Sequence, residues 1–303
     1  MPTARVERAP AKVNLTLRVL GRRPDGYHEI ESLVVFAGVG DTLTFTPGKN
    51  LMLKVLGPTA ALAGDLADNL VLKAVRALGE RYEGLRLGQF VLSKHLPVAA
   101  GVGGGSADAA AALRHLARQN HIRMDDARLL DAARSTGADI PVCLDPQPRM
   151  MRGIGEILSA PWRIPPLPAL LINPRVAVPT KEVFKALGAP SLAPGHASVP
   201  IQDEWANGTD QSRSCEPSCD DVIAYVTDRN NDLEAPAIAL NPTIGQALDA
   251  LRLLPGCRLA RMSGSGATCF ALFPTRRAAQ AAARILRAAR PTWWIRPTVL
   301  GGG

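Results

Sequence analysis

The sequence predicts a mixed α/β fold, because segments with strand periodicity and segments with helical periodicity alternate along the chain. Residues 13–19 alternate apolar and polar side chains, as a half-buried strand does. Residues 68–82 and 124–140 instead place their apolar side chains at helical spacing. With 303 residues the chain is long enough for a substantial core, in two domains or in one large domain.

The first half of the chain contains the clearest element boundaries. Strands are expected on both sides of a turn at 47–50, and again over 85–96. The helix over 68–82 is expected to start with Asp68 as its N-cap, and the helix over 124–140 to end at Gly137. Between them a glycine-rich loop leads into an alanine helix, for which Ser106 is the expected N-cap.

The second half begins after a proline-dense segment, 160–168, which is expected to be the crossing between two domains. Residues 191–221 are rich in Pro, Ser, Gly, Asp and Asn and are expected to form a long loop. Strands are expected over 169–174, 257–264, 267–273 and 293–300, and helices over 180–188, 220–227, 244–254 and 275–290.

The composition is that of a soluble globular protein, with 47% hydrophobic and 20% charged residues. No apolar run approaches the roughly 18 residues that a membrane span needs, and residues 1–11 lack the apolar core of a secretory signal, so a cytoplasmic location is expected. The five cysteines are scattered and are expected to be reduced. Cys215 and Cys219 lack a second close pair of ligands, so no zinc site is expected.

The net charge of +8 raises the question of an anionic partner. The densest basic segment, 275–290, has the pattern of an amphipathic helix with its arginines mostly on the polar face. Aromatic residues make up only 4% of the chain and do not alternate with the basic residues, as they do in single-strand binders. A solvated helix face is therefore favoured, and no nucleic-acid partner is expected. The apolar face would comprise Ala279, Ala282, Ala283, Leu286 and Ala289.

The most unusual stretch is VAAGVGGGSADAAAAL, residues 98–113, which places four glycines ahead of a helix. It lacks the lysine of a Walker loop, and Ser106 stands where the dinucleotide fingerprint needs its last glycine. Glycines nevertheless let backbone N–H groups approach an anion closely, and a helix N-terminus carries partial positive charge. A simple turn needs only one or two glycines, so the pattern favours an anion-binding loop.

Two shorter motifs are ambiguous when each is taken alone. MSGSGATCFALF, residues 262–273, lies between two expected strands and is most simply a hairpin turn. GADIPV places Asp139 after a helix end and before Pro141, where a helix-capping role is the simplest interpretation. Neither motif identifies a function without the rest of the chain.

Taken together and in order, these motifs resemble those of the GHMP kinases. The similarity runs from about residue 9 to 273 and omits the expected loop at 191–221. The glycine loop alone would indicate only the superfamily, whereas PDGYHE and RGIGE resemble a member that phosphorylates a cytidyl diphospho-sugar alcohol in isoprenoid precursor biosynthesis. The matching segments are PAKVNLTLRV, PDGYHEIESL, DNLVLKA, LPVAAGVGGGSADAAAAL, GADIPV, RGIGE, NDLE and MSGSGAT.

The resemblance implies a two-domain α/β (α+β) fold with its active site in the cleft. The ATP-binding N-terminal domain, 1–160, would be like the second domain of ribosomal protein S5, and the substrate-side domain, 161–303, would be ferredoxin-like. ATP would be the phosphoryl donor, with Mg²⁺ held by the nucleotide and no protein metal ligands assigned. A monomer or weak homodimer without membrane or nucleic-acid partners is expected.

The resemblance also assigns roles to individual residues. Asp139 matches the catalytic base and Lys12 its partner, although a lysine at a strand edge is more often there for solubility. Tyr27 and His28 match residues that contact the cytosine, Phe184 matches an aromatic residue on its other side, and the motif at 263–268 would support the glycine loop. The residues expected at ATP are Asn69, Lys94, Pro97, Gly101, Gly103, Gly104, Gly105, Ser106 and Ala107. Those expected at the acceptor substrate are Asn14, Tyr27, His28, Asp139, Thr180, Phe184 and Gly264.

Three main alternatives and a fourth, weaker one remain at this point. The chain is either this kinase, another GHMP-type kinase such as a homoserine or mevalonate-type enzyme, or a nucleotide-binding module without catalysis. The presence of both Lys12 and Asp139 argues against the non-catalytic module. A nucleic-acid binder, suggested only by the net charge, ranks last.

Overall fold

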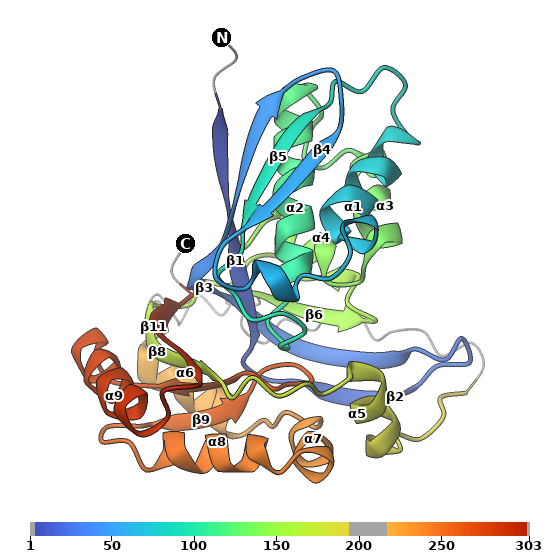
Figure 1. Ribbon diagram of the computed structural model, residues 1–303. Coiled ribbons are helices and arrows are strands. Elements are labelled where there is room, and N and C mark those ends of the chain that lie inside the picture. The colour runs from blue at the N-terminus through green and yellow to red at the C-terminus, as the bar shows by residue number, and fades with distance from the viewer. Residues whose placement is uncertain (1–3, 194–216, 302–303) are drawn as a thin grey trace. The chain divides into compact units, whose positions relative to one another are not determined.

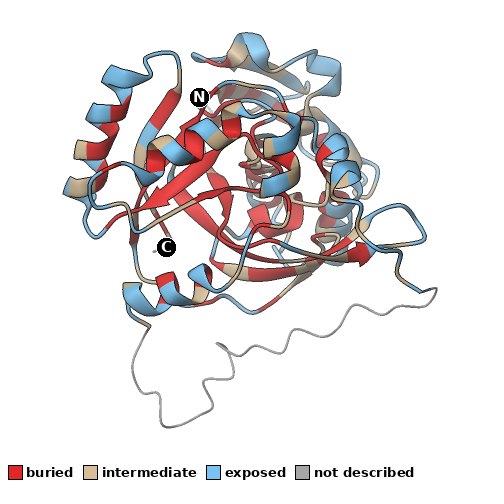
Figure 2. Cartoon of the chain, turned by 90° about the horizontal axis from the view of Figure 1, so that it is seen from below, coloured by how far each residue is buried: buried red, intermediate tan, exposed pale blue. Residues whose placement is uncertain are grey.

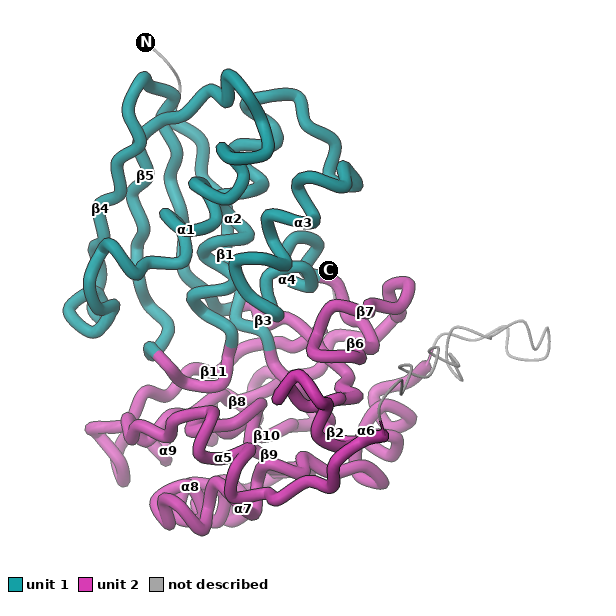
Figure 3. The backbone as a smooth tube through the Cα atoms, turned by 90° about the vertical axis from the view of Figure 1, so that its right-hand side faces the viewer, with its two compact units in different colours: residues 1–12, 39–98, 103–146 teal, residues 13–38, 99–102, 147–303 magenta. Residues whose placement is uncertain are grey.

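A computed structural model describes residues 4–193 and 217–301, and it confirms the mixed α/β fold (Figure 1). The chain divides into two compact units, coloured separately in Figure 3. Unit 1 comprises residues 1–12, 39–98 and 103–146, and unit 2 comprises 13–38, 99–102 and 147–303. Most of the expected loop at 191–221, with Cys215, lies outside the described residues.

Each unit is assembled from separate stretches of sequence. The chain passes between the units within β1 (Arg5–Asn14), within β3 (His28–Pro47), twice around the glycine loop and once after residue 146. The units therefore do not correspond to a single division at residue 160. The assignment of ATP binding to 1–160 and of substrate binding to 161–303 stays a prediction.

Unit 1 combines strands with four helices that pack on one another. β5 (Gly88–Ser93) pairs antiparallel with β3 and parallel with β4 (Met52–Leu56). The strands expected on both sides of the turn at 47–50 are thus present, but β5 lies between them. The helices are α1 (Leu70–Gly79), α2 (Gly104–Gln119), α3 (Ala127–Thr136) and α4 (Ile140–Leu144).

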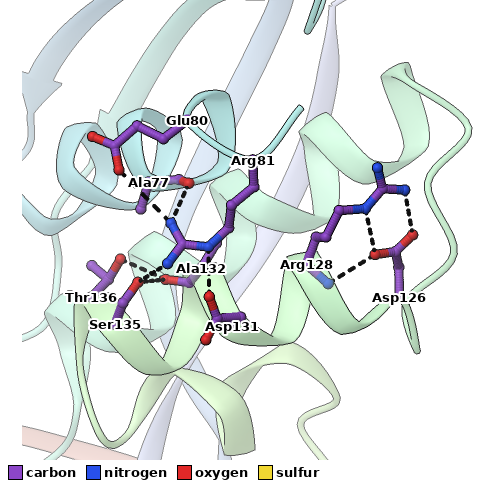
Figure 4. Close-up of polar contacts among 9 residues, drawn as sticks. All are labelled: Ala77, Glu80, Arg81, Asp126, Arg128, Asp131, Ala132, Ser135 and Thr136. Carbon is purple, nitrogen blue, oxygen red and sulfur yellow. Dashed lines mark hydrogen bonds and ion pairs between the residues drawn. The ribbon is translucent and has the colours of Figure 1, made fainter. Parts of the chain in front are cut away.

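Side chains at the helix ends fix how α1 and α3 pack. The N-cap of α1 is Asn69, whose side-chain oxygen accepts from the Val71 N–H at 3.0 Å, so the expectation of Asp68 was wrong by one residue. Gly137 ends α3 as predicted. Just after α1, the Arg81 guanidinium donates to Asp131 of α3 at 2.7 Å, which ties the two helices together (Figure 4).

Unit 2 is built on an antiparallel sheet in which β11, β8, β10 and β9 follow β3 in that order. Met262 pairs with Cys269, so the hairpin expected around MSGSGAT is confirmed. Helices α8 and α9 pack on these strands, and Figure 2 shows the buried strands in red with pale blue outer faces on the helices. The elements are β8 (Leu167–Asn173), α5 (Thr180–Leu187), α6 (Cys219–Thr227), α7 (Glu234–Leu240), α8 (Thr243–Arg252), β9 (Leu259–Met262), β10 (Cys269–Leu272), α9 (Arg276–Ala289) and β11 (Trp294–Leu300).

The arginine-rich segment forms the expected amphipathic helix, α9. Its buried positions are Ala279, Ala282, Ala283 and Leu286. Ala289, the last residue of the helix, is exposed, contrary to the expectation.

Several elements were not predicted. The strand expected from the alternation at 13–19 is split into β1 and β2 (Arg18–Arg22), since Leu17 bonds to the backbone of Asn230 and Asp232 instead of continuing a strand ladder. β3 already begins at His28, and the pattern before residue 41 gave no strand signal because both faces are buried there. The paired strands β6 (Arg149–Gly153) and β7 (Ile157–Leu158) and the short helix α7 were also missed.

The cysteines of the described residues, Cys143, Cys219, Cys257 and Cys269, are all free thiols. Burial and the nearby Asp139 carboxylate raise the pKa of Cys143 to about 12, so this thiol stays protonated and unreactive. Within residues 4–193 and 217–301, no helix has both the length and the apolar character that crossing a membrane requires.

Candidate active site

Lys12 and Asp139 meet in unit 1, although 126 residues separate them in the chain. The Lys12 Nζ lies 2.8 Å from Asp139 Oδ1, and Lys12 is only 4% exposed. Asp139 occupies the N-cap position of α4, but its side chain makes no capping hydrogen bond. The capping interpretation was therefore wrong for the carboxylate, which faces the buried ammonium instead. Such a pair places a hydrogen-bond acceptor and a fixed positive charge at one point.

The start of α2 lies against this pair. The helix begins at Gly104, and its N-cap is Gly103, which has a left-handed φ of 59°. A Cβ on Gly103 would lie 3.2 Å from the Lys12 Cβ and 3.3 Å from its Cε, so glycine lets the loop approach the lysine stem. Ser106 is inside the first turn and is not the N-cap, which corrects the sequence expectation. The first N–H groups of an α-helix have no acceptor within the helix, so this end can receive an anion.

The preceding part of the loop belongs to unit 2 and is fixed by the third glycine motif. Gly101 has a φ of 71°, and a Cβ there would lie 2.5 Å from the Ser263 carbonyl oxygen. The Ser263 hydroxyl donates to the Gly101 carbonyl at 3.0 Å, and the Thr268 N–H donates to the Ala100 carbonyl at 3.1 Å. These bonds confirm that the motif at 263–268 supports the glycine loop.

A buried ionic cluster in unit 1 ties the end of β5 to the first turns of α2. Lys94 donates to Asp41 at 2.5 Å and to Asp108 at 2.7 Å, and all three residues are buried. Burial lowers the pKa of Lys94, but the two carboxylates outweigh it and raise that pKa overall. Burial also raises the pKa of Asp108 to about 7, against the attraction of Lys94. A Cβ on Gly104 would lie 3.5 Å from Lys94 Nζ, so the cluster lies directly behind the loop.

This cluster changes how the expected ATP residues are understood. The Lys94 ammonium and the Asn69 side-chain oxygen are both engaged in structural hydrogen bonds, so each has a role within unit 1 besides the expected contact with adenine. Asp41 and Asp108 were missed at the sequence level. Their sequence signals, an acid between Gly40 and Thr42 and an acid between two alanines, do not distinguish a buried ion pair from a solvated carboxylate.

The aromatic residues expected at the acceptor substrate lie in unit 2. Tyr27 is 59% exposed and lies directly before β3, at the end of the turn between β2 and β3. The rings of His28 and Phe184 stack with their centroids 4.6 Å apart and their planes at 26°. Partial burial and the charge of Arg22 lower the pKa of His28, which keeps its imidazole neutral at physiological pH.

The remaining unit 2 residues form a polar group beside the third glycine motif. Asn14 donates through its amide nitrogen to Ser32 Oγ at 2.7 Å, and its backbone N–H donates to Ser263 Oγ at 3.1 Å. Among the described residues, the buried Asn14 Oδ1 has no hydrogen-bond partner. The Thr180 and Ser265 hydroxyls lie 2.8 Å apart. Gly264 has a φ of 56°, and a Cβ there would lie 3.1 Å from the Gly101 carbonyl oxygen and 3.3 Å from Asn14 Oδ1.

The described residues contain no group of three or more His, Cys, Asp or Glu side chains placed to hold a metal ion. The expected ATP residues Pro97 and Ala107 are buried, whereas Gly103, Gly104, Gly105 and Ser106 are accessible. The accessible surface of the loop is therefore mostly backbone, which suits a phosphate group.

Comparison with known families first gives the class of protein. Residues 69–145 match the GHMP kinases N terminal domain, and residues 222–291 match the GHMP kinases C terminal region. The homoserine kinase of Cytophaga hutchinsonii has the same fold, with a TM-score of 0.68 at 18% identity over 100% of this chain and 97% of that one. The fold and the loop are thus those of a GHMP kinase.

Closer relatives then narrow the family. The 4-diphosphocytidyl-2-C-methyl-D-erythritol kinase of Xanthobacter autotrophicus is 56% identical over 293 residues, covering 97% of this chain and 98% of that protein. The enzyme of that name from Methylorubrum extorquens is 55% identical over 298 residues, covering 97% and 98%. A crystal structure of 4-(cytidine 5'-diphospho)-2C-methyl-D-erythritol kinase matches with a TM-score of 0.75 at 31% identity over 99% of this chain and 100% of that one. The chain belongs to the 4-diphosphocytidyl-2-C-methyl-D-erythritol kinase family, and it is an ATP-dependent kinase.

Proposed function

We propose that this chain transfers the γ-phosphoryl group of ATP to the 2-hydroxyl of 4-diphosphocytidyl-2-C-methyl-D-erythritol. The observation that carries the chemical step is the 2.8 Å contact between Lys12 and Asp139 beside the start of α2. The choice of acceptor rests on the 56% identity to enzymes of that name over nearly the whole chain.

Asp139 is the proposed general base. Its carboxylate accepts the proton of the attacking hydroxyl while the hydroxyl oxygen forms a bond to the γ-phosphorus, and the bond from that phosphorus to the departing ADP oxygen breaks. Lys12, buried and held on Asp139, orients the carboxylate and stabilises negative charge that develops on the attacking oxygen. A positioned base of this kind contributes roughly 10² to 10⁴ in rate.

The ATP phosphates are proposed to bind at the start of α2. The accessible backbone of residues 103–106 at the helix N-terminus can receive a phosphate. Glycine is needed at 103 because of its left-handed φ and because a side chain there would crowd the Lys12 stem. Mg²⁺ carried by the nucleotide would neutralise charge on its phosphates. The buried Lys94–Asp41–Asp108 cluster keeps the loop and β5 in fixed register.

The cytosine is proposed to bind at the rings of Tyr27, His28 and Phe184. An exposed tyrosine beside a stacked His–Phe pair offers aromatic faces to a base. Stacking of a base on an aromatic side chain contributes about 1–3 kcal/mol, which is enough to discriminate against acceptors that lack the base.

The test is ADP release by the purified chain with ATP and each of three acceptors. Turnover is expected with the diphosphocytidyl acceptor and not with homoserine or mevalonate. Turnover of homoserine or mevalonate alone would instead identify another GHMP-type kinase. ATP binding by folded protein without turnover of any acceptor would favour a non-catalytic nucleotide-binding module.

A further inference from the structure

The RGIGE motif, residues 152–156, has no role in the chemistry proposed above. It forms the tight turn between β6 and β7. Its Glu156 carboxylate folds back on the turn and accepts from the Ile154 N–H at 2.6 Å. Gly153 has a φ of 73°, and a Cβ there would lie 2.4 Å from that carboxylate. The glycine and the glutamate are therefore matched, because any side chain at 153 would displace the carboxylate.

This turn lies beside the segment that carries Tyr27 and His28. β6 pairs antiparallel with β3, with Gly153 opposite Ile30. Ile30 is two residues from His28 in β3, so the Glu156 carboxylate is fixed close to the base of the Tyr27–His28 turn. All of these residues belong to unit 2.

Arg23 connects the two turns. Its guanidinium Nη1 lies 3.7 Å from Glu156 Oε1 and 3.7 Å from Glu29 Oε2, and its Nε lies 3.3 Å from Asp25 Oδ2. Its backbone N–H donates to the Tyr27 carbonyl at 2.7 Å and so closes the turn that presents the tyrosine. One residue thus joins the Tyr27 backbone, the acid that follows His28 and the acid of RGIGE.

The interaction of Arg23 with Glu29 matters most, because Glu29 is buried. Glu29 is 2% exposed, and a buried carboxylate is costly unless a positive charge compensates it. The contacts of Arg23 with Glu156 and Asp25 are partly exposed, so solvent screens them and they contribute little to the stability of the fold. Arg23 is therefore held mainly by its ion pair with Glu29, and its ion pair with Glu156 orients the guanidinium. Because the Arg23 N–H also donates to the Tyr27 carbonyl, the position of Arg23 affects the conformation of residues 23–28.

We infer that Arg23 and Glu156 are positioning residues that hold Tyr27 and His28 in the orientation needed to recognise the nucleobase, so that the RGIGE turn is a specificity element. This inference rests on the proposed function, because it concerns the cytidyl end of the proposed acceptor. It assigns no contact with substrate to Arg23 or Glu156 themselves.

The test compares steady-state constants of R23M, E156Q and the double variant with those of the unaltered chain. We expect KM for the cytidyl acceptor to rise about 10-fold in each single variant, which corresponds to about 1.4 kcal/mol. KM for ATP and kcat should change less than about threefold, since the chemistry of unit 1 is untouched. The double variant should be little worse than either single variant, because both remove the same connection.

Controls separate positioning from simple loss of stability. R18M changes an exposed arginine of the neighbouring β2 and should leave both KM values unaltered. R23M/E29Q removes the uncompensated buried charge, so it should recover thermal stability while the acceptor KM stays high. R23K should recover part of the acceptor KM. If R23M does not fold, E156Q carries the test alone, because it keeps an oxygen acceptor for the Ile154 N–H.

The outcomes distinguish this inference from the proposed function. Normal turnover of the cytidyl acceptor with unchanged KM in E156Q and R23M/E29Q would overturn the inference and leave the function standing. Equal rises in KM for ATP and acceptor would also overturn it, since they indicate general loosening. If the unaltered chain does not turn over the cytidyl acceptor at all, the proposed function fails first and the inference falls with it.

Discussion

The Lys12 region of unit 1 and the Tyr27 region of unit 2 are built on opposite physical principles. Around Lys12 the functional groups are charged, buried and held by short hydrogen bonds: Lys12 to Asp139 at 2.8 Å, and Lys94 to Asp108 at 2.7 Å. Around Tyr27 they are aromatic and more exposed, with Tyr27 just before β3, His28 at the start of β3 and Phe184 in α5. Charges that act on a transferring phosphoryl group work best when they are fixed beforehand in a site of low dielectric.

The difference corresponds to what the two regions have to do. Phosphoryl transfer is common to all GHMP kinases, and the glycine loop lies within the match to the GHMP kinases N terminal domain, beside the Lys12–Asp139 pair proposed for the chemical step. Recognition of one acceptor varies from enzyme to enzyme, and binding residues are often found on loops held by a rigid scaffold. We therefore expect changes in the Lys12 region to lower kcat, and changes in the Tyr27 region to raise KM for one substrate only.

The largest effect is expected from D139N. The amide cannot accept the hydroxyl proton, so kcat should fall at least about 100-fold, which corresponds to about 2.7 kcal/mol of transition-state stabilisation. KM for the acceptor should change little, because we propose that the aromatic residues supply most of its recognition. Initial rates of ADP release check this.

The matched control for D139N is D249N, which alters an exposed aspartate paired with Arg252 at 3.0 Å. It should retain full activity, because a surface ion pair contributes little and lies outside both sites. A D139N protein with near-normal kcat would remove Asp139 from the role of base.

The second effect concerns the glycine loop. In G101A the new Cβ would meet the Ser263 and Gly266 carbonyl oxygens at 2.5 and 2.7 Å, at a left-handed φ that alanine adopts only with strain. The loop must shift, so kcat/KM for ATP should fall about 10- to 100-fold. Titration of ATP at saturating acceptor measures this.

G84A is the control for this prediction. Gly84 has almost the same φ, 72°, but a Cβ there meets nothing within 4 Å. It should show the conformational strain, of about 1 kcal/mol in stability, without any loss in kcat/KM for ATP. Equal kinetic losses in both variants would mean that backbone strain and not loop position is responsible.

The contrast between the regions also explains which features could be predicted from sequence. Hydrophobic periodicity predicted most helices and strands, and the glycine pattern predicted the loop. The Lys12–Asp139 pair was implied by the resemblance to the GHMP kinases and had no local signal of its own. Asp41 was missed because its partners, Lys94 and the His95 and Leu96 N–H groups, are about 50 residues away. Ser106 was misassigned because a left-handed glycine replaced the side-chain cap. These features depend on tertiary packing, which local periodicity does not report.

The third effect tests the Tyr27 region. F184A removes the ring stacked on His28, and H28A removes the other ring. Each should raise KM for the cytidyl acceptor about 5- to 150-fold, which is the equivalent of about 1–3 kcal/mol of stacking. KM for ATP should stay within about twofold. F184W retains an aromatic face and should recover most of the affinity, whereas F184L keeps bulk without a ring and should not.

An unchanged acceptor KM in H28A, with intact folding, would favour another GHMP-type kinase. The lowered pKa of His28 adds a condition for these measurements. Because this pKa lies below its ordinary 6.5, the neutral imidazole predominates at neutral and higher pH, and the acceptor KM should change mainly in more acidic solution.

The last prediction concerns D108N and the free energy of unfolding, on which we expect the smallest effect. Burial of the Asp108 carboxylate disfavours its ionised form and so costs stability when it is ionised. Its pKa is about 7 in the folded protein against an ordinary 3.8. Between these values the folded protein holds a proton that the unfolded chain has released, so this group makes the free energy of unfolding fall as pH rises from about 4 to about 7. D108N removes the titration, and the stability of the unaltered chain relative to D108N should therefore decline by at least about 1 kcal/mol across that window.

Urea unfolding at intervals between about pH 4 and 8 measures the decline, with D131N as the control for loss of an exposed carboxylate. D131N should change the free energy of unfolding only slightly, because Asp131 pairs with Arg81 at the surface. A difference between D108N and the unaltered chain that stays constant with pH would mean that Lys94 keeps Asp108 ionised. The cluster would then hold the phosphate loop by charge at every pH, without the protonated form that burial favours.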